Sequence, residues 1–173
     1  MSDNYINDST DELLGINLQG EEQYITFSVS NELYAVDILA VQEMLSWQGC
    51  REVPAARDYI RGIIEVRGLV VPVVDVRKRI LSTLTECDAS TVVILVKTQT
   101  QKVLGLIVEA VCDVCHVSVE AQSDAKGLEG AVELEFVKSV VNVNNNMIMI
   151  IDLEKLVDMQ VLAQYQDKPF PES

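Results

Sequence analysis

The segment Cys112-Asp113-Val114-Cys115-His116 carries the residue types most able to do chemistry. Two cysteines and a histidine at this spacing match c-type haem attachment, with thioether bonds from both sulfurs and His116 as the axial ligand. Such attachment normally takes place outside the cytoplasm, and residues 1–8 have neither the basic start nor the apolar run of a secretory signal. We therefore expect a coincidental match within a β-strand. A small redox or haem protein using Cys112, Cys115 and His116 is the alternative.

Other metal and catalytic chemistry finds little support in the sequence. Zinc would need two more ligands, and the remaining cysteines, Cys50 and Cys87, stand alone. The chain has a single histidine and lacks a Gly-rich phosphate loop, a nucleophile elbow and a metalloprotease helix. Asp75 and Asp152 each precede a short helical pattern, so we interpret both as helix caps. The sequence predicts a protein that is not an enzyme and binds no cofactor.

Composition and net charge indicate where the protein is expected to act and which classes of partner its surface would repel. The net charge is −14 and the pI is about 4.3, so the surface would repel nucleic acid and anionic lipid. No apolar stretch reaches the ~20 residues that span a bilayer, which predicts no direct membrane insertion. With no secretory signal, we expect a cytoplasmic protein whose cysteines are reduced. Hydrophobic residues make up 49% and aromatic residues 5%, a bias toward Val, Ile and Leu that favours strands.

The chain contains an internal duplication. Residues 64–78 and 141–155 both read as a strand, a tight polar turn, a second apolar strand and an Asp that opens a helix. An earlier pair, residues 34–43 and 104–113, repeats in the same order. The copies diverge at the turn, which is Arg67-Gly68 in one and Asn144-Asn145 in the other. Shared apolar positions explain folding, so the unshared polar ones are the better candidates for function.

Short strands at close spacing, together with the duplication, predict a mainly β fold of two similar small barrels rather than a parallel sheet. We expect a short helix or irregular turn over residues 36–44, a helix from Ala55 to Arg61 that stops at Gly62, a short helix after Asp75, and a C-terminal helix after Asp152. The expected organisation is an acidic tail over 1–21, barrel units over about 22–85 and 86–160 that can exchange strands, and a helix end and tail over 161–173. The groove between the units is the expected partner site.

Two charged residues stand out in apolar surroundings. Arg67 lies between two strands at a tight turn, and its counterpart is Asn144, so the fold does not require a cation there. A salt bridge, for example to Glu65, competes with a partner contact through the planar guanidinium. Glu43 follows Val41 in a largely apolar stretch, and the second copy keeps an acid there, Asp113. A solvated charge and a binding residue are both open interpretations of Glu43.

Residues 62–77, Gly-Ile-Ile-Glu-Val-Arg-Gly-Leu-Val-Val-Pro-Val-Val-Asp-Val-Arg, resemble the central signature of the CheW family of chemotaxis coupling proteins. Residues 34–44 resemble the family's earlier signature, at the expected distance upstream, and Val53-Pro54 also fits. The resemblance spans about residues 22–160. One departure is Glu65-Val66, where the family usually has Asn-Leu before the signature arginine; it places an acid beside Arg67.

The resemblance implies two pseudo-equivalent SH3-like five-stranded barrels with a hydrophobic groove between them, and a non-enzymatic adaptor recruited to membrane-associated receptor arrays. Its implied partners are methyl-accepting chemotaxis receptors and the regulatory domain of the histidine kinase CheA. Carried over by motif position, Arg67 and Glu43 are binding residues, with Glu65 beside them, and Val41, Gly62 and Gly68 shape the site. A coupling protein of a pilus or other surface-motility system is the alternative within this class.

Overall fold

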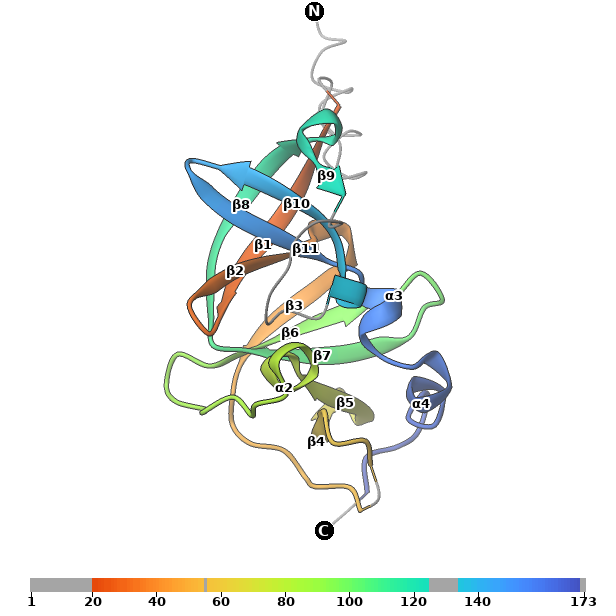
Figure 1. Ribbon diagram of the computed structural model, residues 1–173. Helices are drawn as coiled ribbons and strands as arrows, with labels where there is room; N and C mark the ends of the chain where they lie inside the picture. The colour runs from red at the N-terminus through yellow and green to blue at the C-terminus, as the bar shows by residue number, and fades with distance from the viewer. Residues whose placement is uncertain (1–19, 55, 125–133, 172–173) are drawn as a thin grey trace, which may run out of the picture.

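The computed structural model describes residues 20–54, 56–124 and 134–171, and their fold is mainly β, as the sequence predicts (Figure 1). The strands form two sheets. The strands are β1 (Glu21–Val29), β2 (Glu32–Asp37), β3 (Val41–Ser46), β4 (Ile60–Val66), β5 (Leu69–Asp75), β6 (Val92–Lys97), β7 (Val103–Val108), β8 (Ala110–Ser118), β9 (Ser123–Asp124), β10 (Val137–Val143) and β11 (Asn146–Ile151).

The two sheets have the same internal plan. The six-stranded sheet has the order β8-β1-β2-β11-β10-β9, and the five-stranded sheet has the order β3-β6-β7-β5-β4. Each contains a central antiparallel hairpin, one parallel contact (β2 with β11, β7 with β5) and a second hairpin beyond it. Matching bulges interrupt β1–β8 and β3–β6. This repetition of plan is the structural form of the duplication in the sequence.

Each sheet takes strands from both copies of the repeat. The hairpin β1–β2 joins β8, β10 and β11, while β6 and β7 join β3, β4 and β5. The two expected units, 22–85 and 86–160, therefore exchange strands, because the leading hairpin of each copy pairs with strands of the other copy.

A large core fills the space between the two sheets. Phe27, Tyr34, Ile94, Leu104 and Met149 are all fully buried members of it, drawn from β1, β2, β6, β7 and β11. Smaller cores lie on the other face of each sheet. Alternate side chains of one strand thus enter different cores, which explains why several strands are apolar almost throughout. A groove that opens within the five-stranded sheet is described below.

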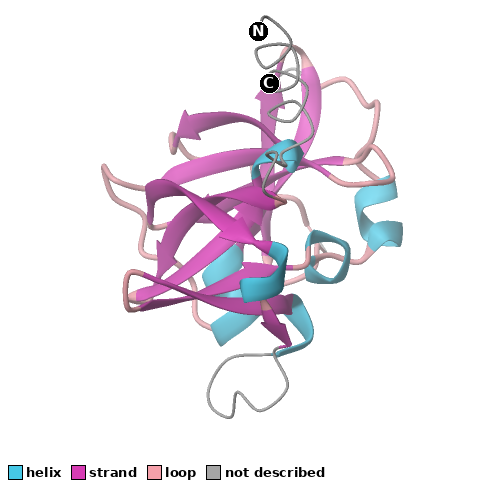
Figure 2. Cartoon of the chain, turned by 90° about the horizontal axis from the view of Figure 1, so that it is seen from above, coloured by secondary structure: helices cyan, strands magenta, loops and turns pink. Residues whose placement is uncertain are grey.

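Helices contribute little to the fold and lie beside the strands (Figure 2). The α-helices are α2 (Val76–Leu81), α3 (Leu153–Leu156) and α4 (Met159–Ala163). The side chain of Asp75 accepts a hydrogen bond from the N–H of Lys78, and that of Asp152 accepts one from Glu154, which confirms both as caps. The expected C-terminal helix is two helices, because Val157 is extended and Asp158 caps a second start.

One local prediction was wrong, and another was confirmed only in part. Residues 56–59 are not helical, and Ile60 and Arg61 already belong to β4, so Gly62 lies within a strand and stops no helix. Tyr59 and Ile60 enter the buried core from this extended segment. Residues 38–40 form a single 3-10 turn, after which the chain extends as β3, so Glu43 lies on a strand. Tertiary pairing outweighs helical spacing in both segments.

Part of the predicted organisation falls on residues that the structure does not describe. Residues 1–19 of the acidic tail and residues 125–133 of the second unit lie outside the described residues. Within the part of the chain that the structure describes, no helix combines the length and apolar character needed to cross a membrane.

Candidate functional site

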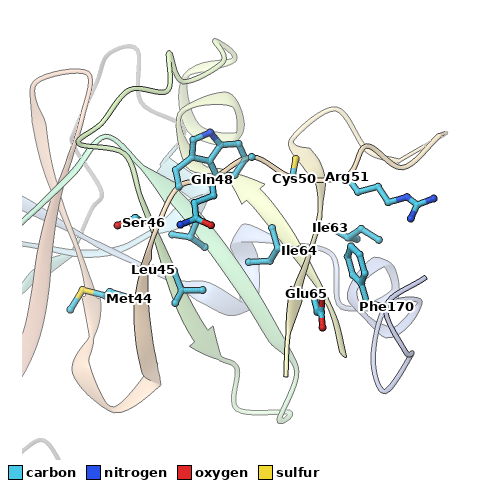
Figure 3. A pocket seen from close by; sticks show the side chains of 13 residues that line it. Met44, Leu45, Ser46, Gln48, Cys50, Arg51, Ile63, Ile64, Glu65 and Phe170 are labelled. Carbon is cyan, nitrogen blue, oxygen red and sulfur yellow. The ribbon is translucent and has the colours of Figure 1, made fainter. Parts of the chain in front are cut away.

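A groove of about 850 Å³ opens in the five-stranded sheet between its two edge strands, β3 and β4 (Figure 3). The chain after β3 crosses to β4 at one end, where Arg51 and Ile63 exchange two backbone hydrogen bonds of 2.8 Å. At the other end, the turn after β4 reaches β3 through the ion pair between Arg67 and Glu43. The two edge strands are thus joined at both ends and held apart between them.

The floor of the groove is the small core of the five-stranded sheet. Leu45, Trp47 and Ile64 pack against that core and line the groove, as does the buried Val93. Met44 lies on the rim with 49% of its surface exposed. Polar rim positions come from both sides of the opening: Ser46, Gln48, Arg51 and Glu65. An apolar floor within a polar rim is the anatomy of a protein-binding surface.

The ion pair at the end of the groove connects Arg67 Nη2 to Glu43 Oε2 at 2.5 Å. The partner of Arg67 is therefore Glu43 on β3, not its neighbour Glu65. The Arg67 side chain is 73% exposed and that of Glu43 is 32% exposed. A solvent-screened pair of this kind contributes about 0–1 kcal/mol to folding. The pair holds two functional groups in a fixed relation more than it stabilises the fold.

Arg67 also has an unusual backbone. Its φ is 51° and that of Gly68 is 82°, so both residues of this hairpin turn have positive φ, as a type I′ turn requires. The equivalent residues Asn144 and Asn145 have φ values of 51° and 67°. Asparagine tolerates this conformation and arginine is not favoured there. The turn geometry alone would select Asn or Gly, so the arginine calls for a functional explanation.

The two glycines shape the site for different reasons. Gly68 occupies the second position of the turn, and an added Cβ there would meet open space, so its positive φ is what matters. Gly62 is buried where the backbone of Arg51 crosses β4. A Cβ at Gly62 would collide with the Arg51 carbonyl oxygen and lie 2.8 Å from the Cys50 sulfur. Gly62 thus permits the crossing that closes one end of the groove.

Trp47 contacts Arg61, which is held in place by an ion pair and a hydrogen bond. The Arg61 guanidinium carbon lies 6.0 Å from the centre of the Trp47 ring, within the range of a cation–π contact. Arg61 is fixed in turn by Asp75, at 2.7 Å, and by the carbonyl oxygen of Thr85, at 3.0 Å. Asp75 is fully buried and also accepts hydrogen bonds from the N–H and hydroxyl of Thr85. This network fixes Arg61 beneath one wall of the groove.

The structure brings Glu43, Glu65, Arg67 and Gly68 together at one end of the groove, while Gly62 lies at the other. Val41 is apart from them, because its side chain is half-buried against the core between the sheets.

Sequence reasoning missed Trp47 and Phe170, which also line the groove. Trp47 carried a usable signal: it is the only tryptophan in the chain, and its counterpart in the second copy is Val117.

The Cys112-to-His116 segment lies in β8, an edge strand of the six-stranded sheet, as expected. Cys112 and His116 are exposed, whereas Cys115 is half-buried against the small core of that sheet. Burial raises the pKa of the Cys115 thiol, and the nearby Asp113 raises it further. A raised pKa disfavours the thiolate that redox or metal chemistry needs. Among residues 20–54, 56–124 and 134–171, no three His, Cys, Asp or Glu side chains are grouped to hold a metal ion.

Comparison with known proteins identifies the fold and the family. A family model described as the CheW-like domain matches residues 23–161. The chain is 28% identical to the chemotaxis protein CheW of Klebsiella aerogenes over 142 residues, covering 82% of this chain and 85% of that protein. It is 31% identical to CheW of Bacillus subtilis over 140 residues, covering 80% and 88%. The crystal structure of the scaffolding protein TtCheW from Thermoanaerobacter tengcongensis superposes with a TM-score of 0.72 at 28% identity, covering 80% and 90% of the two chains. The matched span contains both sheets and the Arg67–Glu43 pair, and the chain belongs to the CheW family.

Proposed function

We propose that this protein is a non-enzymatic coupling adaptor that links methyl-accepting chemotaxis receptors to the histidine kinase CheA. The observation that carries the proposal is the groove of the five-stranded sheet with the Arg67–Glu43 pair at its end, in a chain of the CheW family. Its relatives are described as chemotaxis and scaffolding proteins, which supports the same role. Binding, rather than turnover, is what this arrangement of side chains offers.

The groove supplies the apolar part of a binding surface. Leu45 and Trp47 come from β3 and the chain after it, and Ile64 comes from β4 on the other side of the groove. Tryptophan is among the residues that most often dominate the energy of an interface, above all where neighbouring groups exclude water. Because Arg61 braces Trp47 before any partner arrives, part of the ordering cost of binding is already met.

Arg67 supplies the directional part. Its guanidinium has five N–H donors, and Glu43 engages one end of it while most of the side chain faces solvent. A partner carboxylate or carbonyl can therefore bind to the exposed donors. The pair with Glu43 fixes the orientation of the guanidinium, and charge complementarity at this point would favour one partner register over others.

The test of the proposal is reconstitution of receptor, CheA and this protein, with kinase autophosphorylation as the readout. The proposal predicts that kinase output depends on this protein and responds to receptor ligand only in its presence. Output that is the same with and without it would contradict the proposal for that receptor and kinase.

A charge-swapped variant separates the two roles open to Arg67. Arg67→Glu combined with Glu43→Arg restores an ion pair between β3 and the turn with the signs reversed. If the pair only joins the two strands, the double variant should couple as well as the parent. We expect the double variant to fold normally and to fail in coupling, because the partner binds the cation at the turn.

A further inference from the structure

We propose that the C-terminal segment 168–171, here called the strap, covers one end of the groove and must be displaced when a partner fills it. This inference rests on the proposed function, because it takes the groove as the partner site. It concerns a segment that follows the last helix, α4, and that the matched family span, residues 23–161, does not include.

The strap pairs with the hairpin that carries Arg67. The N–H of Val70 donates to the carbonyl oxygen of Lys168 at 3.0 Å, and the N–H of Phe170 donates to the carbonyl oxygen of Gly68 at 2.9 Å. Leu69 and Pro169 are the antiparallel partners between these two bonds. The strap is thus a short extra strand along the start of β5, beginning beside the turn.

Phe170 places an aromatic side chain in the groove. It lines the same groove as Ile63 and Glu65, and its ring lies beside these two residues in Figure 3. Beyond it, a nitrogen of Arg51 donates to the carbonyl oxygen of Pro171 at 3.3 Å. The strap therefore links the start of β5 to the Arg51 crossing and places Phe170 at that end of the groove.

The prolines of the strap leave its outer edge unable to donate hydrogen bonds to a further strand. Because Lys168 and Phe170 bond to β5, the backbone nitrogens of Pro169 and Pro171 lie on the side away from it. Proline has no N–H, so this outer edge cannot donate to a further strand. The strap closes the edge of the hairpin without offering a new one to another chain.

The strap is held lightly, while the chain before it is anchored. Lys168, Pro169 and Pro171 are exposed and Phe170 is only half-buried. Gln166, in contrast, makes two side-chain hydrogen bonds of 3.3 Å to the backbone of Val103. Asp167, with φ of 58°, turns the chain between the anchor and the strap. A segment fixed at Gln166 and bound weakly beyond Asp167 can leave the groove without disturbing the sheet.

Occupation by the strap lowers the apparent affinity of the groove. If the strap is closed for about 70–90% of the time, a partner that needs the groove open binds about threefold to tenfold more weakly than to a strapless chain. The expected size of the effect is therefore a modest gain in affinity when Phe170 is removed.

Two variants test this expectation: Phe170→Ala in the full chain, and a chain ending at Asp167, which keeps the Gln166 anchor. The matched control is Lys168→Ala, which removes an exposed side chain of the strap and leaves its backbone hydrogen bond intact. Affinity is measured for a receptor signalling-tip fragment and for the CheA regulatory domain. Urea midpoints of all chains show whether the fold is unchanged.

The proposal predicts that both strap variants bind at least one fragment about threefold to tenfold more tightly than the parent, with Lys168→Ala unchanged. Equal affinity would show that the strap does not compete, and weaker affinity would show that Phe170 is part of the partner contact; either result overturns the proposal. If no chain binds either fragment, the proposed function fails instead. The strap is then judged with the apolar dye anilinonaphthalene sulfonate, whose binding must increase in both strap variants and not in Lys168→Ala.

Discussion

The two sheets of this protein repeat one plan but differ in charge at the turn of the outer hairpin. In the six-stranded sheet the outer hairpin turns through Asn144-Asn145, which suits the required backbone and adds no charge. In the five-stranded sheet the same turn carries Arg67, paired with Glu43 on the opposite edge strand. The comparison teaches that the turn conformation is set by the fold, whereas the cation at the turn is an addition to it.

Other unshared positions gather around the same opening. Trp47 corresponds to Val117, and Gly62 corresponds to Ser139, by the offsets of the two repeats. Both residues of the five-stranded sheet belong to the groove or to the crossing that closes it. Arg67, Trp47 and Gly62, which the second copy replaces, thus all lie around one groove. Substitutions that exchange or remove these residues test whether they account for the difference between the sheets.

The largest effect is expected at Gly62. Gly62→Ser installs the residue of the other sheet, where Ser139 is buried and donates to the Gln122 side chain. At Gly62 the added Cβ meets the Arg51 backbone, so we expect a loss of about 2–3 kcal/mol in the free energy of unfolding, measured by urea denaturation. The reverse change, Ser139→Gly, should cost about 1 kcal/mol. Equal costs at the two sites would show that Gly62 and Ser139 have equally tight surroundings.

Reversal of the charge at the turn comes next. Arg67→Glu should weaken binding to receptor or kinase fragments by about 2 kcal/mol, roughly 30-fold, because it removes a cation and repels a partner acid. Its melting temperature should change little, since exposed substitutions usually stay within about 0.5 kcal/mol. The matched variant Asn144→Glu should leave binding unchanged. A large fall in the melting temperature of Arg67→Glu would show a structural role instead.

A smaller difference between the sheets appears at high pH. Burial raises the pKa of Tyr34 from its ordinary 10.0 to about 12, with a lesser contribution from Glu32, and the equivalent residue in the other sheet is Leu104. The stabilisation from keeping this phenol neutral is complete below pH 10 and is lost as pH rises toward 12. At pH 11, about 1 kcal/mol of this stabilisation still remains in the free energy of unfolding.

Tyr34→Phe should remove that part of the pH dependence. The Tyr34 hydroxyl has no hydrogen-bond partner among the described residues, so stability at pH 7 should be equal or slightly higher in the variant. Unfolding by urea at pH 7 and at pH 10–12 checks both expectations. An unchanged slope above pH 10 would place the titration elsewhere.

The smallest effect is expected at the cysteines of the six-stranded sheet. Cys112→Ser with Cys115→Ser should leave partner affinity unchanged, because β8 is remote in the sheet order from the β3–β4 groove. Metal analysis and an absorption spectrum of the parent and the double variant provide the check. A stoichiometric metal, or a Soret band, that the double variant loses would contradict this expectation.

The sequence predicted the parts of the fold that local pattern and duplication record. Two copies of a strand–turn–strand–Asp unit predicted two equivalent sheets, and the turns and caps followed from residue type. The exchange of strands between copies is a choice among long-range pairings, and no local pattern decides it. The helix expected over Ala55–Arg61 failed because Tyr59 and Ile60 enter the core between the sheets, and β4, which pairs with β5, already begins at Ile60.

The candidate site was predictable only in part. Glu43, Glu65, Arg67 and Gly68 were placed by motif position, and the structure brings them to one end of the groove. The strap could not be predicted, because Pro169 and Pro171 indicate the end of regular structure and their pairing with β5 depends on tertiary contact.

The central claim is that coupling acts through the five-stranded sheet, and exchanging the two turns tests it most directly. Arg67→Asn gives both sheets an asparagine turn, and adding Asn144→Arg moves the cation to the six-stranded sheet in a backbone of the same φ. Kinase autophosphorylation is measured with receptor, CheA and each variant. We predict that Arg67→Asn loses receptor control of the kinase without loss of stability, and that adding Asn144→Arg does not restore it. Full control by the turn-swapped chain, or by Arg67→Asn alone, would contradict the account.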